Sequence, residues 1–106
     1  IKVTTKSNTG NKWYLLINNF SELRAGDKYI DNEYFYWYGW NEGKGTWYGT
    51  GKDQLQLTPS TAYESSRGEG PDMPNGVSNY FKFGVKIRKN EQAGNYETII
   101  QFTITE

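Results

Sequence analysis

The stretch YFKFGVKIR, residues 80–88, alternates apolar and polar side chains with a period of two. One side of the pattern holds Phe81, Phe83, Val85 and Ile87, and the other side holds Tyr, Lys, Gly and Arg residues. Because successive side chains of a β-strand point to opposite faces, this pattern predicts a strand with one buried and one solvated face. The chain is therefore expected to build its core between such strands.

The same period recurs on both sides of this stretch. It is found in IKVTT (1–5), KWYLLIN (12–18), QLQLT (54–58) and NYETIIQFTIT (95–105), and turns rich in Gly, Asn, Asp and Pro separate these runs. Only FSELRAG (20–26) has the signals of a helical turn, with Ser21 as its cap and Gly26 as its stop. We predict an all-β fold, a single antiparallel β-sandwich of about seven to nine short strands, with a closed five- or six-stranded barrel as the alternative.

The inward positions of these strands define the predicted core. They are Trp13, Leu15, Ile17, Phe35, Trp37, Leu55, Leu57, Phe81, Phe83, Val85, Ile87, Ile100, Phe102 and Ile104. Segment 65–78 carries five Gly and Pro residues among polar ones, so we expect it to be mobile rather than packed.

Length and composition limit the function. The 106 residues suit one domain, 1–106, and a first residue Ile1 rather than Met suggests excision from a longer secreted protein. The chain contains no Cys and no His, and its carboxylate pairs, Asp31 with Glu33 and Asp53 with Glu64, lie in polar turns. We therefore predict no enzymatic activity and, because no apolar run is long enough to cross a bilayer, no membrane insertion.

Charge argues against nucleic acid as a partner. Twelve basic and twelve acidic residues cancel, whereas binding of a phosphate backbone depends on excess Lys and Arg. A basic stripe of Lys82, Lys86, Arg88 and Lys89 interleaves with Tyr80, but acidic residues follow it closely. We interpret the stripe as a solvated strand face that discourages aggregation between strands.

The run YFYWYGW, residues 34–40, has six aromatic side chains in seven positions. In a strand, Phe35 and Trp37 share one face, which we assign to the core because neither has a phenol hydroxyl to satisfy. The tyrosines and Trp40 then share the opposite face. The turn NEGKG follows, and a hairpin return through TWYGTG would bring Trp47 or Tyr48 onto the same aromatic surface.

Two interpretations of this outer row stay open. It could be structural, covered by segment 65–78 or by another subunit. It could also be a flat platform that stacks on sugar rings, with Trp40 as the main anchor. The ligand-binding residues of such a platform would be Tyr36, Tyr38, Trp40, Tyr48, Asn41 and Lys44.

A weak calcium signal lies just before this run. Asp27, Asp31, Asn32 and Glu33 supply oxygen ligands near one turn, and calcium prefers oxygen. Their spacing matches no fixed calcium loop, so we favour solvated acids and expect no cofactor.

The C-terminal strand follows the pattern AGxYxxxIxFxI, with Ala93, Gly94, Tyr96, Ile100, Phe102 and Ile104 at its defined positions. This pattern resembles the closing strand of bacterial extracellular Ig-like or pilin-like sandwich domains. KWYLLIN and YIDNEYFYW are similar to earlier strands of such domains, and Tyr96 would return its hydroxyl to the preceding loop as in a tyrosine corner. The density of aromatic residues in 34–40 departs from the family pattern.

The resemblance implies an Ig-like or jelly-roll-like sandwich and an extracellular, secreted or cell-surface location. It implies a non-catalytic module of a bacterial surface, filament or adhesion protein, with neighbouring domains or subunits as partners. The surplus aromatic residues keep a polysaccharide-binding module as the alternative.

Overall fold

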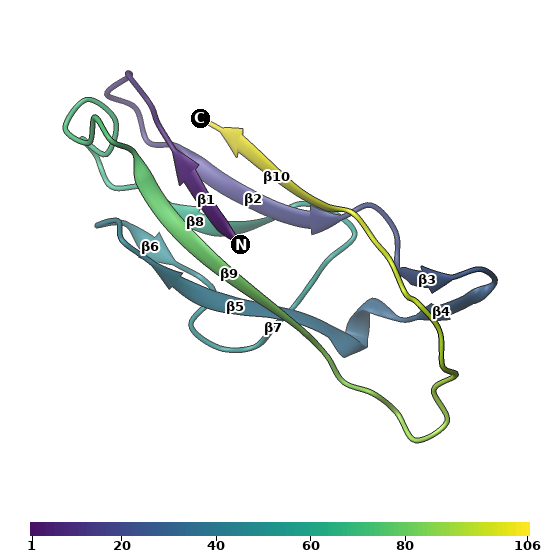
Figure 1. Cartoon of the computed structure of the whole chain (residues 1–106). Helices are drawn as coiled ribbons and strands as arrows, with labels where there is room; N and C mark the ends of the chain where they lie inside the picture. Colours follow the sequence, from purple (N-terminus) through teal and green to yellow (C-terminus); the bar gives the residue numbers. More distant parts are fainter.

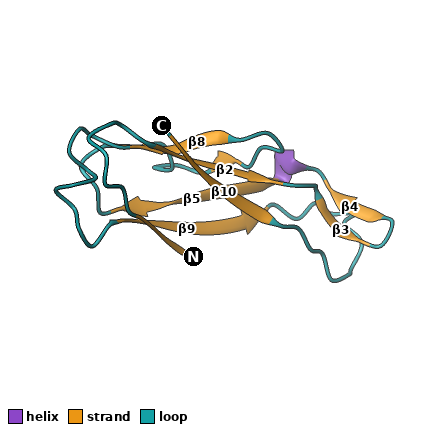
Figure 2. Ribbon diagram, turned by 90° about the horizontal axis from the view of Figure 1, so that it is seen from above, coloured by secondary structure: helices purple, strands orange, loops and turns teal.

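Two four-stranded antiparallel sheets pack face to face in the computed structural model, which describes residues 1–106 (Figure 1). The first sheet has the spatial order β1 (Lys2–Thr5), β9 (Val77–Val85), β5 (Phe35–Asn41) and β7 (Asp53–Gln54). The second sheet has the order β10 (Ile100–Thr105), β2 (Tyr14–Asn19), β8 (Ser60–Glu64) and β6 (Thr46–Trp47). In Figure 2, β2 and β8 form one layer and β5 and β9 form the other.

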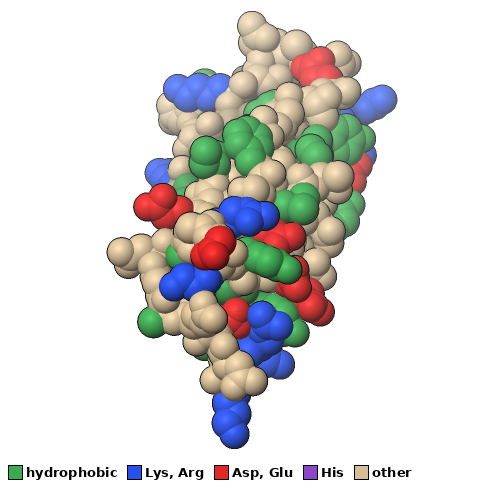
Figure 3. All heavy atoms as spheres, turned by 90° about the vertical axis from the view of Figure 1, so that its right-hand side faces the viewer, with side chains coloured by type: hydrophobic (Ala, Val, Ile, Leu, Met, Phe, Trp, Pro, Cys, Tyr) green, Lys and Arg blue, Asp and Glu red, His purple; other side chains and the backbone are tan.

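A small hairpin extends one end of the sandwich. It consists of β3 (Leu23–Ala25) and β4 (Lys28–Ile30), and the 3-10 turn η1 (Asn32–Tyr34) connects it to β5. The molecule measures 50 × 22 × 19 Å along its principal axes. Hydrophobic, basic and acidic side chains are intermixed over the hairpin end (Figure 3). No helix is long and apolar enough to pass through a bilayer.

The fold confirms the predicted antiparallel β-sandwich, with ten strands rather than seven to nine. The extra strands are two or three residues long, too short to show a period of two. From β5 onward, successive strands alternate between the two sheets, so the only pairing between consecutive strands is that of β3 with β4.

The core lies between the sheets and matches much of the prediction. Trp37, Trp47 and Phe81 form its aromatic centre, with ring centroids 5.3–5.7 Å apart. The predicted core residues that are buried are Trp13, Leu15, Ile17, Phe35, Trp37, Leu55 and Phe81. Phe83, Val85, Ile100 and Phe102 are partly buried against this cluster. Ala62, Tyr63 and Val77 are buried residues that the prediction missed.

Three predicted core residues are exposed. Leu57 is 45% exposed because β7 ends at Gln54 and the chain then crosses toward the second sheet. Ile87 is 67% exposed because it lies beyond the end of β9. Ile104 is 47% exposed on β10, an edge strand that is open to solvent at its side. A period of two therefore does not predict burial where the chain leaves its sheet or where the strand lies at an open edge.

Two local predictions are also wrong. Residues 23–25 of the expected helical turn form β3, which pairs with β4 around Gly26 at a φ of 65°. Segment 65–78 is packed rather than separate from the core, because Ser65 and Glu69 are 1% and 4% exposed. The indole Nε1 of Trp13 donates a hydrogen bond of 2.7 Å to the carbonyl oxygen of Glu69, which fastens the segment to the core.

Candidate ligand-binding face

The aromatic run of β5 divides between the two faces of the first sheet. Phe35 and Trp37 are 6% and 2% exposed and point inward, whereas Trp40 is 50% exposed on the outer face. The predicted alternation is thus confirmed. Gly39 interrupts the rings because a Cβ there would run into the carbonyl oxygen of Tyr80 on β9. This position therefore brings β5 and β9 close together.

The outer face gains a further ring from β9. The register places Trp40 opposite Tyr80, and their rings are stacked with centroids 5.1 Å apart and an interplanar angle of 11°. The rings of Tyr36 and Tyr38 form a second stack, with a centroid separation of 6.2 Å. Tyr36 also covers Gly84, since a Cβ at Gly84 would collide with its ring.

Lysine side chains lie over these rings. The Nζ atoms of Lys82, Lys2 and Lys52 are 5.5, 5.8 and 5.0 Å from the ring centroids of Trp40, Tyr80 and Tyr36. Such cation–π contacts contribute about 0.5–1 kcal/mol at exposed sites. The ion pairs of the chain are Lys12–Glu64 and Arg88–Glu91, so no acid neutralises these three ammonium groups. We use the name aromatic face for the outer surface formed by Tyr36, Tyr38, Trp40, Tyr80, Lys2, Lys52, Lys82 and Lys86.

The aromatic face is not the flat platform that the sequence suggested. A ring stacked on its neighbour presents its edge and at most one face to a ligand, and one face of Trp40 is already covered by Tyr80. The rings therefore do two things: they offer hydroxyl and indole edges, and they hold lysine ammonium groups in place.

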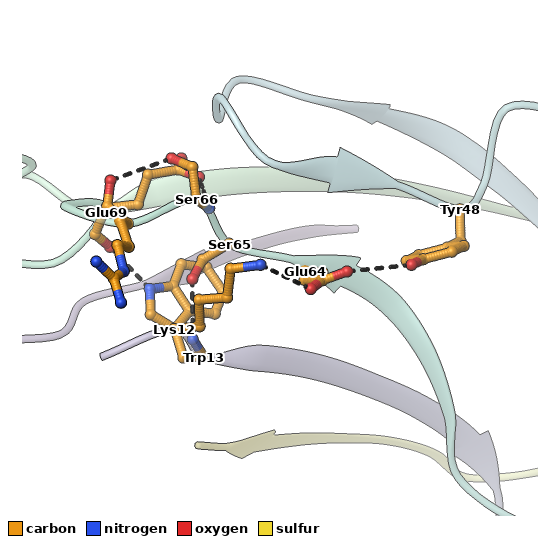
Figure 4. Close-up of polar contacts among 8 residues, drawn as sticks. Lys12, Trp13, Tyr48, Glu64, Ser65, Ser66 and Glu69 are labelled. Carbon is orange, nitrogen blue, oxygen red and sulfur yellow. Dashed lines mark hydrogen bonds and ion pairs between the residues drawn. The ribbon is translucent and has the colours of Figure 1, made fainter. Parts of the chain in front are cut away.

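Tyr48 does not belong to the aromatic face. Residues 46–47 form β6 in the second sheet, so the expected hairpin with β5 does not exist, and Trp47 packs into the core instead. Tyr48 donates a hydrogen bond of 3.2 Å to Glu64, whose carboxylate also pairs with Lys12 at 3.1 Å (Figure 4). The hydrogen bond from Lys12 is the main reason that the pKa of Glu64 is lowered, and the hydrogen bond to Glu64 raises the pKa of Tyr48.

The other predicted binding residues, Asn41 and Lys44, form hydrogen bonds within the chain, and so does Glu42 between them. Asn41 accepts a hydrogen bond of 2.8 Å from the backbone N–H of Gly43, which stabilises the turn after β5. The backbone N–H of Lys44 donates to the carboxylate of Glu69 at 2.8 Å, while its side chain is exposed. Glu42 accepts a hydrogen bond of 2.9 Å from the hydroxyl of Tyr80. These residues border the aromatic face rather than continue it.

The residues considered for calcium are dispersed. Asn32 is buried and exchanges amide hydrogen bonds of 2.7 and 3.0 Å with Asn19, so its side chain points into the sandwich. Asp27 and Asp31 lie in a depression that also contains Arg88, whereas Glu33 lines a different one. No group of three or more acidic side chains suits a metal ion. The expectation of solvated acids without a cofactor stays a prediction.

A depression at one end of the aromatic face was not predicted. It has a volume of about 370 Å³ and is lined by Glu33, Tyr34, Tyr36, Lys52, Gln54 and Lys86. The pairing of β7 with β5 brings Lys52 and Gln54 beside the tyrosines. A two-residue strand gives no periodic signal, so nothing in the sequence could have located this site.

The predicted hydrogen bond of Tyr96 is present, with its hydroxyl donating to the carbonyl oxygen of Gln92 at 2.7 Å. The regular strand begins later than expected, at Ile100. Gly94 has no positive φ, but a Cβ there would lie 3.0 Å from that of Ala25, so the position allows close approach to the β3–β4 hairpin. No protein-family model, curated protein or solved structure shows a significant match to this chain. The resemblance to bacterial surface domains stays a prediction.

Proposed function

We propose that the chain is a non-catalytic extracellular module of a bacterial surface, filament or adhesion protein, and that it attaches to its partner through the aromatic face. The observation that supports this most strongly is the concentration of four rings and uncompensated lysines on one outer sheet face, with Trp40 half exposed. Aromatic rings with a polar edge are the side chains that recur in binding surfaces. The partner is a neighbouring domain or subunit, or a polysaccharide.

The second candidate is a carbohydrate-binding module. It is favoured by the tyrosine hydroxyls and the indole edge of Trp40, which suit hydrogen bonding and partial stacking with sugar rings. Stacking of a nucleobase on an aromatic ring contributes about 1–3 kcal/mol, and we take this range as an upper bound for a sugar. Loss of one anchor ring should then weaken binding by roughly 5- to 150-fold.

The test is sedimentation of the labelled domain with intact bacterial cells, isolated cell walls and insoluble polysaccharides. We expect the wild-type domain to bind at least one of these surfaces, and Trp40→Ala to bind it more weakly by the factor given above. Tyr48→Ala is the matched control, because Tyr48 is also half exposed but lies on the second sheet. Equal binding by wild type and Trp40→Ala would remove the aromatic face from the function, and so would binding to none of these surfaces.

A further inference from the structure

We infer that the ligand of the aromatic face is an acidic polysaccharide, and that one of its carboxylates occupies the depression between Tyr34, Tyr36, Lys52, Gln54 and Lys86. The inference rests on the proposed function, since it names the ligand of the same face. It follows from how the structure arranges positive charge there.

Two lysines from distant parts of the chain line the depression: Lys52, just before β7, and Lys86, just beyond β9. The backbone N–H of Lys86 donates to the carbonyl oxygen of Tyr34 at 2.8 Å, which holds the end of β9 beside η1. Lys52 precedes β7 and lies over the ring of Tyr36 at 5.0 Å. Neither lysine has an acidic partner within 4.0 Å, and the amide of Gln54 adds a hydrogen-bond donor. A carboxylate placed between them would receive charge-assisted hydrogen bonds.

Arg88, by contrast, has an acidic partner within the chain. Arg88 lies over the ring of Tyr34 at 4.5 Å and donates to both carboxylate oxygens of Glu91, at 2.9 and 3.0 Å. Its charge is satisfied within the chain, whereas the charges of Lys52 and Lys86 are not. Glu33 is the one acid that lines the depression, and it is exposed to solvent at the rim.

Positive charge continues along the face beyond the depression. Lys82 lies on β9 and Lys86 just beyond its end. Four residues of extended chain separate them, which is about 13 Å. Lys2 lies across from Tyr80 on β1. Charges spread over this distance match a polymer with repeating anionic groups better than a single small ion.

A polysaccharide fits this face better than a nucleic acid. Bases bind single-strand platforms by stacking on free ring faces, but Tyr80 covers one face of Trp40, and the tyrosine rings of β5 stack on each other. Sugar hydroxyls instead require edge donors and acceptors, which the tyrosine hydroxyls supply.

The experiment is affinity electrophoresis of the whole chain in gels containing polygalacturonate, fully methyl-esterified polygalacturonate, dextran or poly(dT). We expect retardation by polygalacturonate, which decreases with added salt, and little retardation by the esterified polymer, whose carboxylates are blocked. The double variant Lys52→Gln/Lys86→Gln should bind polygalacturonate at least about fivefold more weakly, since several weak contacts multiply along a polymer. Glu33→Gln should bind more tightly.

Lys12→Gln is a single-charge control, because it removes one lysine from the outer face of the second sheet. It should leave retardation unchanged, and thermal melting of each variant should show that it folds. The inference would be overturned if the esterified polymer retarded the wild-type chain as strongly as polygalacturonate does. It would also be overturned if polygalacturonate retarded the double variant as strongly as the wild type. Either result would leave a neutral polysaccharide as the ligand. Stronger retardation by poly(dT) than by polygalacturonate would identify a nucleic-acid surface instead. Failure to bind any polymer or cell wall would overturn the proposed function as well.

Discussion

On the outer face of the second sheet, Tyr48, Glu64 and Lys12 form a chain of hydrogen bonds of 3.2 and 3.1 Å, as Figure 4 shows. On the outer face of the first sheet, Lys82 and Lys52 lie over aromatic rings and have no acidic partner. Both faces carry tyrosine and lysine, so composition alone does not separate them. The difference is that one face satisfies its charges internally and the other leaves them available to a partner.

The largest expected effect on stability comes from a substitution in the core between the two sheets. Phe81 is 2% exposed and its ring contacts those of Trp37, Trp47 and Phe102. Phe81→Ala should lower the free energy of unfolding by about 3–5 kcal/mol, because it leaves a cavity between the sheets. Phe83→Ala on the same strand should have a smaller effect, since Phe83 is only partly buried. Urea unfolding measures both, and an equal loss for the two variants would contradict this description of the core.

An intermediate effect is expected at Glu69, which lies just beyond β8 of the second sheet. Its carboxylate accepts hydrogen bonds from the hydroxyl of Tyr63 at 2.6 Å and from the backbone N–H groups of Ser66 and Lys44 at 2.7 and 2.8 Å. Burial acts to raise the pKa of Glu69, but these hydrogen bonds outweigh it and lower the pKa below its ordinary value. The folded-state pKa is therefore below that of the unfolded chain.

The direction of this pKa shift determines how the stability depends on pH. The contribution of Glu69 is fully present above the pKa of the unfolded chain, and it is lost as the pH falls through the lowered folded-state value. Glu69→Gln should destabilise the domain by about 1–3 kcal/mol near neutral pH, since an amide cannot accept all these bonds. It should also flatten the acid limb of a plot of melting temperature against pH. Glu97→Gln, at an exposed glutamate, is the control. If the melting temperature of Glu69→Gln fell at acid pH as steeply as that of the wild type, the lowered folded-state pKa of Glu69 would be contradicted.

The smallest effects on stability are expected for the exposed rings themselves. Trp40→Ala removes the stack on Tyr80 and should lower the free energy of unfolding by about 0.5–1.5 kcal/mol. Tyr48→Phe removes one solvated hydrogen bond to Glu64 and should leave the melting temperature unchanged. Thermal melts of the two variants would therefore separate the stacked face from the hydrogen-bonded one. A larger loss for Tyr48→Phe would reverse the comparison.

Sequence reasoning succeeded where a strand stays in one sheet. The sides taken by Phe35, Trp37 and Trp40 followed correctly from a period of two, because β5 pairs with β9 along its full length. It failed at Leu57 and Tyr48, which follow short strands at points where the chain changes sheets. A turn rich in Gly has the same local signals whether it returns to the same sheet or crosses to the other.

Long-range pairing also hid the most specific part of the candidate site. Lys52 and Gln54 join Tyr36 only because two residues of β7 pair with β5, and no local pattern encodes this contact. Composition predicts a polar, mobile segment around Glu69, because it does not reveal that a carboxylate can be buried by accepting several hydrogen bonds. The sequence also does not show which lysines lack an acidic partner, because that depends on the ion pairs formed in the folded chain.

The alternation of successive strands between sheets has a consequence for how the chain folds. Apart from the β3–β4 hairpin, no pair of strands is local, and completing the first sheet requires residues 2–85 while completing the second requires residues 14–105. Loop-closure entropy must be overcome before either sheet gains stability, which is typical of sandwiches that fold in milliseconds to seconds. Neither sheet can form from a short contiguous fragment. Removing β1 or β10 from the ends of the chain would expose a new strand edge in a different sheet each time.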